Sequence, residues 1–263
     1  MRKLLWTALG LGLAVIYFPL VVVLLNSFNA DTTFGWPPSR FTLEWWSRAA
    51  SNAGALHALW TSVQAGLAAT AIALVLGTMA AFALQRYRFF GRNPVSLLII
   101  LPIALPGVVT GVALANFFTT MIGIQLGMFT LIVSHATFCI VTVFNNAVAR
   151  LRRLGSNLEE ASMDLGAGTF RTFYKITLPM LRSSLLAGCL LAFALSFDEI
   201  IVTTFTVGQG IQTLPIWIYQ NLFRPNQAPV VNVVAAVLIL ASIVPIWLAQ
   251  KLAGTDESVA AAR

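Results

Sequence analysis

Charged residues are scarce in this sequence: they make up only 10% of its 263 residues, whereas apolar residues make up 58%. Soluble domains carry about 25% charged and about 45–50% apolar residues. A soluble fold of this length would expose a large apolar surface with few charges to balance it. The scarcity of charge, with a mean hydropathy of +0.84, therefore excludes a soluble domain and indicates a polytopic helical membrane protein.

Cysteine and histidine are equally scarce, with two residues of each type. Cys139 and Cys189 both lie within apolar runs, which favours buried thiols over a disulfide framework. The sequence has no CxxC motif and no histidine or cysteine pair at a metal-ligand spacing, so it predicts no metal site. It also lacks low-complexity tracts, which excludes collagen-like and disordered chains.

Motifs of nucleotide binding and catalysis are missing as well. No GxxxxGK[ST] loop is present, so we do not expect this chain to hold ATP. No nucleophile is accompanied by an adjacent base, so the sequence predicts no catalytic residues and disfavours an intramembrane enzyme. A net charge of +7 would suggest nucleic-acid binding in a soluble protein, but here the basic residues cluster between apolar runs, where they set membrane orientation.

Six apolar runs are long enough to cross the hydrocarbon core, which needs about 20 predominantly apolar residues. They occupy residues 4–25, 59–84, 95–122, 129–149, 185–207 and 229–249. The first follows Arg2 and Lys3, as in a signal peptide, but it lacks a small-residue cleavage pattern, so we expect a retained helix. Pro102 and Pro106 predict a kink or break in the third run. The sequence therefore predicts an all-α fold with a single transmembrane domain, residues 1–263.

Basic residues are shared unequally between the two sets of loops that alternate along these spans. Both tails and the loops on their side, including 150–184, hold thirteen of the sixteen Lys and Arg residues. The opposite set holds only Arg40, Arg48 and Arg224. Because cytoplasmic loops carry the excess of Lys and Arg, we expect both termini in the cytoplasm and the loop 26–58 outside.

The outer loop 26–58 is long enough to contain structure of its own. Thr42 can cap a short helix over residues 43–48. The adjacent Trp45 and Trp46 suit a helix lying at the membrane interface, where amphipathic rings are enriched. A docking surface for an external partner is the alternative, and the two roles are compatible.

The cytoplasmic loop 150–184 is charged and patterned. Ser156 can cap a short helix with Glu159 at its third position, which is a capping-box arrangement, and Gly166 supplies a natural end for that helix. A second amphipathic segment follows, and Pro179 predicts a bend before the chain re-enters the membrane.

Two short helices that meet at a glycine would form a compact knob on the cytoplasmic side. Glu159, Glu160 and Asp164 are expected to give this knob an acidic face. On physical grounds two interpretations stay open: an amphipathic hairpin resting on the bilayer, or a surface that docks a partner protein.

One motif in this loop has a specific spacing. Its residues are Glu160-Ala161-Ser162, Gly166 after three further residues, and Ile176-Thr177-Leu178-Pro179 after nine more. The pattern resembles the EAA loop of ABC importer permeases, which reads E-A-A, three residues, G, nine residues, I-x-L-P. Ser162 stands where that family has a second alanine.

Other segments extend the resemblance over roughly residues 19–245. They are Arg86-Tyr87-Arg88-Phe89-Phe90-Gly91, Leu101-Pro102, Leu105-Pro106-Gly107, Ala192-Phe193-Ala194-Leu195-Ser196-Phe197-Asp198-Glu199 and Thr213-Leu214-Pro215. Together they are similar to the second permease subunit of bacterial putrescine/spermidine-type ABC importers. The resemblance implies the six-helix, MetI-like fold of type I importers, in the bacterial inner membrane.

The resemblance also implies partners and roles. The loop would dock in a groove of a separate ATPase subunit, present in two copies, which would hold the ATP and Mg²⁺ while this chain binds no cofactor. The coupling residues implied are Glu159, Glu160, Ala161, Ser162, Asp164, Gly166, Ala167, Ile176, Leu178 and Pro179. A sister permease and a periplasmic solute-binding protein are the other implied partners.

The solute implied is a polyamine, and relatives in the same branch imply other small solutes such as 4-aminobutyrate as the alternative. A secondary carrier or channel would need no ATPase, and such a protein has no evident use for an exposed EAA-type loop.

Asp198 and Glu199 are the only carboxylates within the predicted spans, and no Lys or Arg lies in any span to pair with them. Since a membrane-embedded charge costs on the order of 2.5–3.5 kcal/mol, such residues suggest a function. They are candidates for the path of a cationic solute. Alternatively, the span ends near Phe197 and the pair lies at the headgroups or contacts the sister subunit. Asn116 and Asn145 are weaker candidates, because polar residues within spans more commonly bond between helices, as we also expect of His135.

Overall fold

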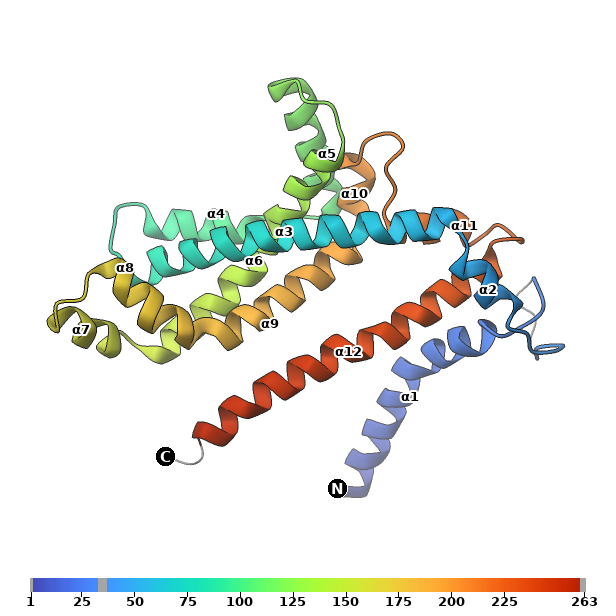
Figure 1. Ribbon diagram of the computed structural model, residues 1–263, viewed down its shortest axis with the longest axis horizontal. Coiled ribbons are helices and arrows are strands. Elements are labelled where there is room, and N and C mark those ends of the chain that lie inside the picture. The colour runs from blue at the N-terminus through green and yellow to red at the C-terminus, as the bar shows by residue number, and fades with distance from the viewer. Residues whose placement is uncertain (1, 33–36, 261–263) are drawn as a thin grey trace. The chain divides into compact units, whose positions relative to one another are not determined.

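A computed structural model describes residues 2–32 and 37–260, with side chains described up to residue 243 and at Trp247. In these ranges the chain is helical, with no strand and one isolated antiparallel bridge between Asn29 and Phe41. It forms two compact units, residues 1–59 with 216–248 and residues 60–215 with 249–263. Figure 1 labels the helices. They are α1 (Arg2–Asn26), α2 (Glu44–Ala50), α3 (Ala53–Arg86), α4 (Arg92–Ala104), α5 (Gly107–Asn116), the π-helix η1 (Phe117–Ile122), α6 (Met128–Leu154), α7 (Asn157–Asp164), α8 (Thr169–Thr172), the π-helix η2 (Phe173–Thr177), α9 (Leu178–Phe197), α10 (Ile201–Thr206), α11 (Leu214–Asn221) and α12 (Ala228–Ala260).

Four helices are long and apolar enough to cross a membrane: α1, α3, α6 and the continuous helix Thr169–Phe197. A fifth candidate is the pair Arg92–Ala104 and Gly107–Ile122, whose two parts are bent by 108° at the break. In α12, which runs from Ala228 to Ala260, the apolar stretch with described side chains is Ala228–Ile243. The described residues thus contain up to five spans, and a sixth over 229–249 stays a prediction.

The break predicted in the third apolar run is confirmed, and Pro106 is the residue that produces it. Pro102 lies inside α4, which continues to Ala104. Leu105 then turns extended, with φ −83° and ψ 146°. A proline ring disfavours the helical conformation of the residue before it, so the helix ends just before Pro106.

Two sequence expectations, one about the fifth run and one about the segment before it, differ from the structure. The run was expected to form one span over residues 185–207, but α9 ends at Phe197 and α10 begins at Ile201, so the alternative in which the helix ends near Phe197 is the one confirmed. Pro179 was expected to bend the chain, but the helix passes through it without interruption from Thr169 to Phe197. The turn before Pro179 is the π-helix η2, and such local widening accommodates a residue that lacks the amide proton.

Within the unit formed by residues 60–215 and 249–263, α6 is the central helix, buried along most of its length. α3 and α9 pack closely on it at Gly77 and Gly188. A Cβ atom at Gly77 would lie 3.0 Å from the carbonyl oxygen of Ile140, and one at Gly188 would lie 3.3 Å from Cα of Val143. These glycines therefore set how near the helices approach.

In the unit formed by residues 1–59 and 216–248, the short helix predicted in the outer loop is confirmed as α2. The N-cap position is Leu43 and carries no side-chain cap, so the cap expected of Thr42 is wrong, although its hydroxyl accepts the amide of Glu44 at 3.1 Å. Trp45 is buried, with the guanidinium of Arg48 4.7 Å above its ring. Trp46 stacks on Phe28 with 5.2 Å between ring centroids. Both tryptophans therefore have packing partners within the chain.

Candidate functional site

The helices α7 and α8 with the turn between them, residues 157–172, form a small knob beyond the ends of the long helices of their unit (Figure 1). Gly166 ends α7 as predicted: its φ is +86°, and its amide donates to the carbonyl of Met163 at 2.9 Å. The amide of Ala167 donates to the carbonyl of Ser162 at 3.1 Å. The hydroxyls of Ser162 and Thr172 are 3.0 Å apart and tie α7 to α8.

The capping box predicted for α7 is wrong. Ser156 precedes the helix, but its hydroxyl donates to the carboxylate of Glu160 at 2.5 Å and makes no cap bond. Glu159 is buried, and its carboxylate forms an ion pair with Arg86 at the end of α3. Burying a carboxylate is costly unless it is paired with a positive charge, so Glu159 binds the Arg86 guanidinium and does not accept a hydrogen bond from the backbone at the start of α7. Glu159 is consequently absent from the exposed acidic face expected of the knob.

The remaining knob surface combines charge with exposed apolar side chains. Glu160 and Asp164 are both exposed. Beside them, Leu165 is 90% and Phe170 83% exposed, and Leu158 is exposed as well. Large apolar side chains that face outward in a cluster mark a contact surface rather than a soluble face. This geometry suits either interpretation left open by the sequence: contact with a partner protein or with a bilayer.

The second half of the EAA-type motif lies where the knob joins α9. Ile176 belongs to η2 and Leu178 begins α9; both are half-buried, and Leu178 packs against the hydrophobic core of the unit. Pro179 is exposed in the first turn of α9. The motif therefore spans the knob and the base of a long apolar helix, so a displacement of the knob is transmitted to that helix.

A cavity of about 430 Å³ lies where two helices are broken. One wall comes from the break between α4 and α5 and the other from the break between α9 and α10. The lining residues are Pro102, Ile103, Leu105, Gly107, Thr110, Phe138, Leu195, Asp198, Glu199, Ile200, Ile201 and Val202. Helix ends and extended backbone leave polar groups free for a ligand, as in transporter sites built from discontinuous helices.

Asp198 and Glu199 are thus brought together in this cavity, in different settings. The carboxylate of Glu199 accepts the amide of Val202 at 2.8 Å and so helps to start α10. Asp198 follows the last residue of α9 and is exposed. Within the part of the chain that the structure describes, neither carboxylate forms an ion pair. The cavity therefore carries negative charge with no basic side chain to balance it.

His135 braces the same break from within the core. It is buried on α6, where Nδ1 is 2.7 Å from the hydroxyl of Ser196 and Nε2 is 2.8 Å from that of Thr203. The hydroxyl of Thr203 also donates to the carbonyl of Glu199 at 2.8 Å. The expected interhelical role of His135 is confirmed, and Ser196 and Thr203 are the partners that sequence reasoning did not identify.

Asn116 and Asn145, the weaker candidates, are both exposed and do not line the cavity. Sequence reasoning in turn missed the wall from the α4–α5 break, although Pro102 and Pro106 had marked that break. The sequence did not indicate that the break in the third apolar run lies next to the break in the fifth, because a single sequence carries no signal of which helices are neighbours.

The chain matches a protein-family model over residues 73–253, and it belongs to that family, the binding-protein-dependent transport system inner membrane components. It is 34% identical over 240 residues to the spermidine/putrescine transport system permease protein PotC of Escherichia coli (strain K12), covering 91% of this chain and 90% of that protein. It is 33% identical over 239 residues to the putrescine transport system permease protein PotI of the same strain, covering 87% of this chain and 83% of the relative.

A solved structure shares the fold. A crystal structure of a bacterial ABC transporter involved in the import of the acidic polysaccharide alginate aligns with a TM-score of 0.70 and 15% sequence identity, covering 95% of each chain. The predicted helical permease fold is therefore confirmed. The protein is a membrane permease subunit of a binding-protein-dependent transport system, and its relatives PotC and PotI are transport permeases as well.

Proposed function

We propose that this permease subunit carries a polyamine of the putrescine or spermidine type across the bacterial inner membrane, with both of its termini in the cytoplasm. The observation that carries the proposal is the cavity between the two broken helices, which holds Asp198 and Glu199 without a basic partner among the described residues. A linear polycation is attracted to such a site, because Coulomb attraction strengthens where protein replaces water. The names of the relatives PotC and PotI supply the solute class.

The energy for import comes from a separate ATPase subunit. Two copies of this subunit bind the pair of permeases, and they hold the ATP and Mg²⁺. In this chain the knob is the docking surface, through the exposed Glu160 and Asp164 and the apolar Leu165 and Phe170. A ligand shifts a conformational equilibrium only by binding its two states differently. ATP-bound ATPases must therefore favour one position of the knob over the other.

Two further partners complete the transporter. A sister permease supplies the second half of the pathway, and a periplasmic solute-binding protein delivers the solute to the outer loop, where α2 lies. The full proposal is thus a heteromeric importer in which this chain supplies an acidic cavity and one coupling surface.

The test is uptake of labelled putrescine, spermidine and 4-aminobutyrate by a host from which this chain has been deleted. Wild-type chain should restore polyamine uptake, and Glu160→Arg should abolish that rescue while inserting normally, because it reverses the charge of the docking surface. Asn93→Arg, which adds a charge at an exposed position of α4 outside the knob, is the matched control and should restore uptake.

Other outcomes contradict separate parts of the proposal. If only 4-aminobutyrate uptake is lost on deletion and then restored, the importer class stands and the polyamine assignment fails. If Glu160→Arg restores uptake as well as wild type does, the knob is not the ATPase docking surface, and a carrier independent of ATPase becomes the better description.

A further inference from the structure

The ion pair between Arg86 and Glu159 joins four segments of the chain at the base of the knob. Arg86 is the last residue of α3, and its Nε lies 2.6 Å from Glu159 Oε2. Its Nη2 donates to Glu159 Oε1 at 3.2 Å and to the carbonyl of Gly155, which follows α6, at 2.6 Å. The hydroxyl of Thr177, just before α9, donates to the same Glu159 Oε1 at 2.8 Å. We call these four residues the Arg86 junction.

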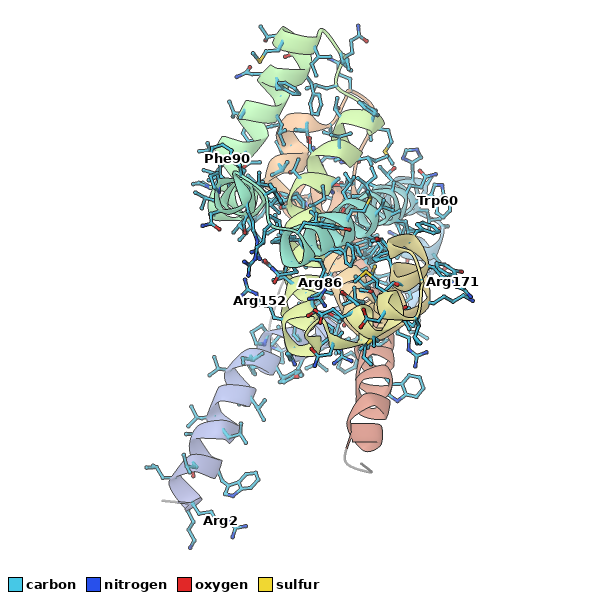
Figure 2. The ribbon with its side chains drawn as sticks, turned by 90° about the vertical axis from the view of Figure 1, so that its left-hand side faces the viewer. Arg2, Trp60, Arg86, Phe90, Arg152 and Arg171 are labelled. Carbon is cyan, nitrogen blue, oxygen red and sulfur yellow. The ribbon has the colours of Figure 1, made fainter. Side chains whose placement is uncertain are left out.

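The ion pair and the Thr177 hydroxyl are largely shielded from water, whereas Gly155 lies at the exposed edge of the junction. The side chains of Arg86 and Glu159 are 15% and 11% exposed, and Thr177 is 1% exposed. Figure 2 shows Arg86 inside this end of its unit, whereas Arg152 and Arg171 lie toward its outer edges. Charged hydrogen bonds in such a setting hold their geometry, and the planar fork of arginine lets one side chain serve several acceptors at once. Lysine has a single ammonium nitrogen, so it cannot place one nitrogen at Glu159 Oε2 while a second donates to the Gly155 carbonyl.

The covalent connections of α7 are, in contrast, pliable. α7 has eight residues, and a glycine with positive φ lies near each of its ends: Gly155 at +65° and Gly166 at +86°. Glycine has no Cβ atom to restrict rotation, and hinges in proteins are often such residues. The Ser162–Thr172 pair ties α7 only to the helix that follows it, so without the Arg86 junction a displacement applied to α7 would reach α3 and α6 only through rotation at these two glycines.

We propose that Arg86 is a positioning residue for transport: through Glu159 it fixes α7 to α3, α6 and α9, so that a displacement of the knob moves those helices together. This inference rests on the proposed function, because it requires that a partner displaces the knob. It assigns Glu159 a task separate from docking: Glu160 faces the partner while Glu159, one position earlier, faces the membrane helices.

The test uses the complete transporter, with ATPases, sister permease and binding protein, reconstituted in lipid vesicles. Assembly, ATP hydrolysis and uptake of labelled putrescine are measured on the same vesicles. Arg86→Lys keeps the positive charge and should assemble and hydrolyse ATP, while the putrescine imported per ATP falls about tenfold, within the range of ordinary allosteric couplings. Arg88→Gln, an exposed arginine two residues further on, is the control and should match wild type.

A second pair of variants separates transmission from folding. Arg86→Gln leaves Glu159 buried without its partner, which destabilises a protein, whereas Arg86→Gln combined with Glu159→Gln leaves no unpaired charge. The double variant should therefore assemble at least as well as Arg86→Gln and still import about tenfold less putrescine per ATP. A merely structural pair would instead lose assembly and regain normal coupling when assembly returns.

The outcomes are distinguishable. Wild-type import per ATP in Arg86→Lys overturns the inference, and so does recovery of normal coupling in the assembled double variant. If wild-type vesicles import none of putrescine, spermidine or 4-aminobutyrate when ATP is supplied, the proposed function fails before the variants are compared.

Discussion

At the scale of single residues, Asp198 and Glu199 show how adjacent carboxylates acquire different tasks. Glu199 is bound to the amide of Val202 and belongs to the start of α10. Asp198 lies at the end of α9, exposed at the same cavity. The charge of Asp198 is therefore the one more accessible to a solute, while Glu199 also has a structural role.

This difference predicts distinct effects of neutral substitutions. Asp198→Asn should raise the putrescine concentration at half-maximal uptake about tenfold, because it removes one attraction of about 1–4 kcal/mol. Glu199→Gln keeps an oxygen that can accept the Val202 amide, so it should show a smaller effect, whereas Glu199→Ala also loses this hydrogen bond, at about 1 kcal/mol of stability. Concentration dependence of uptake in cells with equal amounts of each variant measures this. An unchanged half-maximal concentration in Asp198→Asn would remove Asp198 from the solute path.

The sequence identified the acidic pair but misassigned Glu159. The residues S-x-x-E satisfy the local pattern of a capping box, and that pattern takes no account of the rest of the chain. Arg86 is 73 residues away from Glu159 in sequence, yet the Glu159 carboxylate binds Arg86 and not the backbone at the start of α7. A buried carboxylate without a charged partner would destabilise the fold, so the ion pair is favoured over the local cap. Local spacing predicts local hydrogen bonds only when no distant charge competes.

At the scale of helices, one of the two breaks that line the cavity can be predicted from the sequence and the other cannot. Pro106 fixes the first break through a backbone restriction that acts on its own neighbour. The second break falls in the stretch Asp198–Ile200, after which the apolar residues Ile201 and Val202 continue the hydropathy of the span. Hydropathy reports what surrounds a segment and not where its backbone hydrogen bonds stop, so the predicted span ran on to residue 207.

Close helix packing gives a prediction at this scale. Gly77→Ala should destabilise the protein, because its Cβ atom would lie 3.0 Å from the Ile140 carbonyl oxygen and 3.1 Å from the Phe144 amide, and α3 and α6 would have to separate. Gly12→Ala in α1 meets nothing within 4 Å, so there the ordinary helix preference for alanine, about 1 kcal/mol, should appear as a gain. Thermal unfolding of the chain purified in detergent compares the two. Equal effects of the two substitutions would contradict the packing described for α6.

At the scale of the whole molecule, composition alone was enough to predict a helical membrane protein, and the EAA-type spacing was enough to predict the family. What composition could not supply is the way the helices of the unit formed by residues 60–215 and 249–263 meet around α6. That arrangement depends on long-range contacts such as His135 with Ser196 and Arg86 with Glu159. These pairs are separated by dozens of residues, and periodicity within one helix carries no record of them.

The orientation in the membrane is a prediction of the whole chain, because it follows from the distribution of all sixteen basic residues between two sets of loops. It is tested with single cysteines in a background where Cys139 and Cys189 are alanine. Ser51→Cys, after α2, should react with a membrane-impermeant maleimide in cells whose outer membrane is permeabilised but whose inner membrane is intact. Asn93→Cys and Asn157→Cys should react only after the inner membrane is opened; all three positions are exposed, so access reports sidedness rather than burial. Reaction of Asn157→Cys while the inner membrane is intact would place the knob outside, where no ATPase reaches it. That result would contradict both the orientation predicted from the basic residues and the coupling proposal.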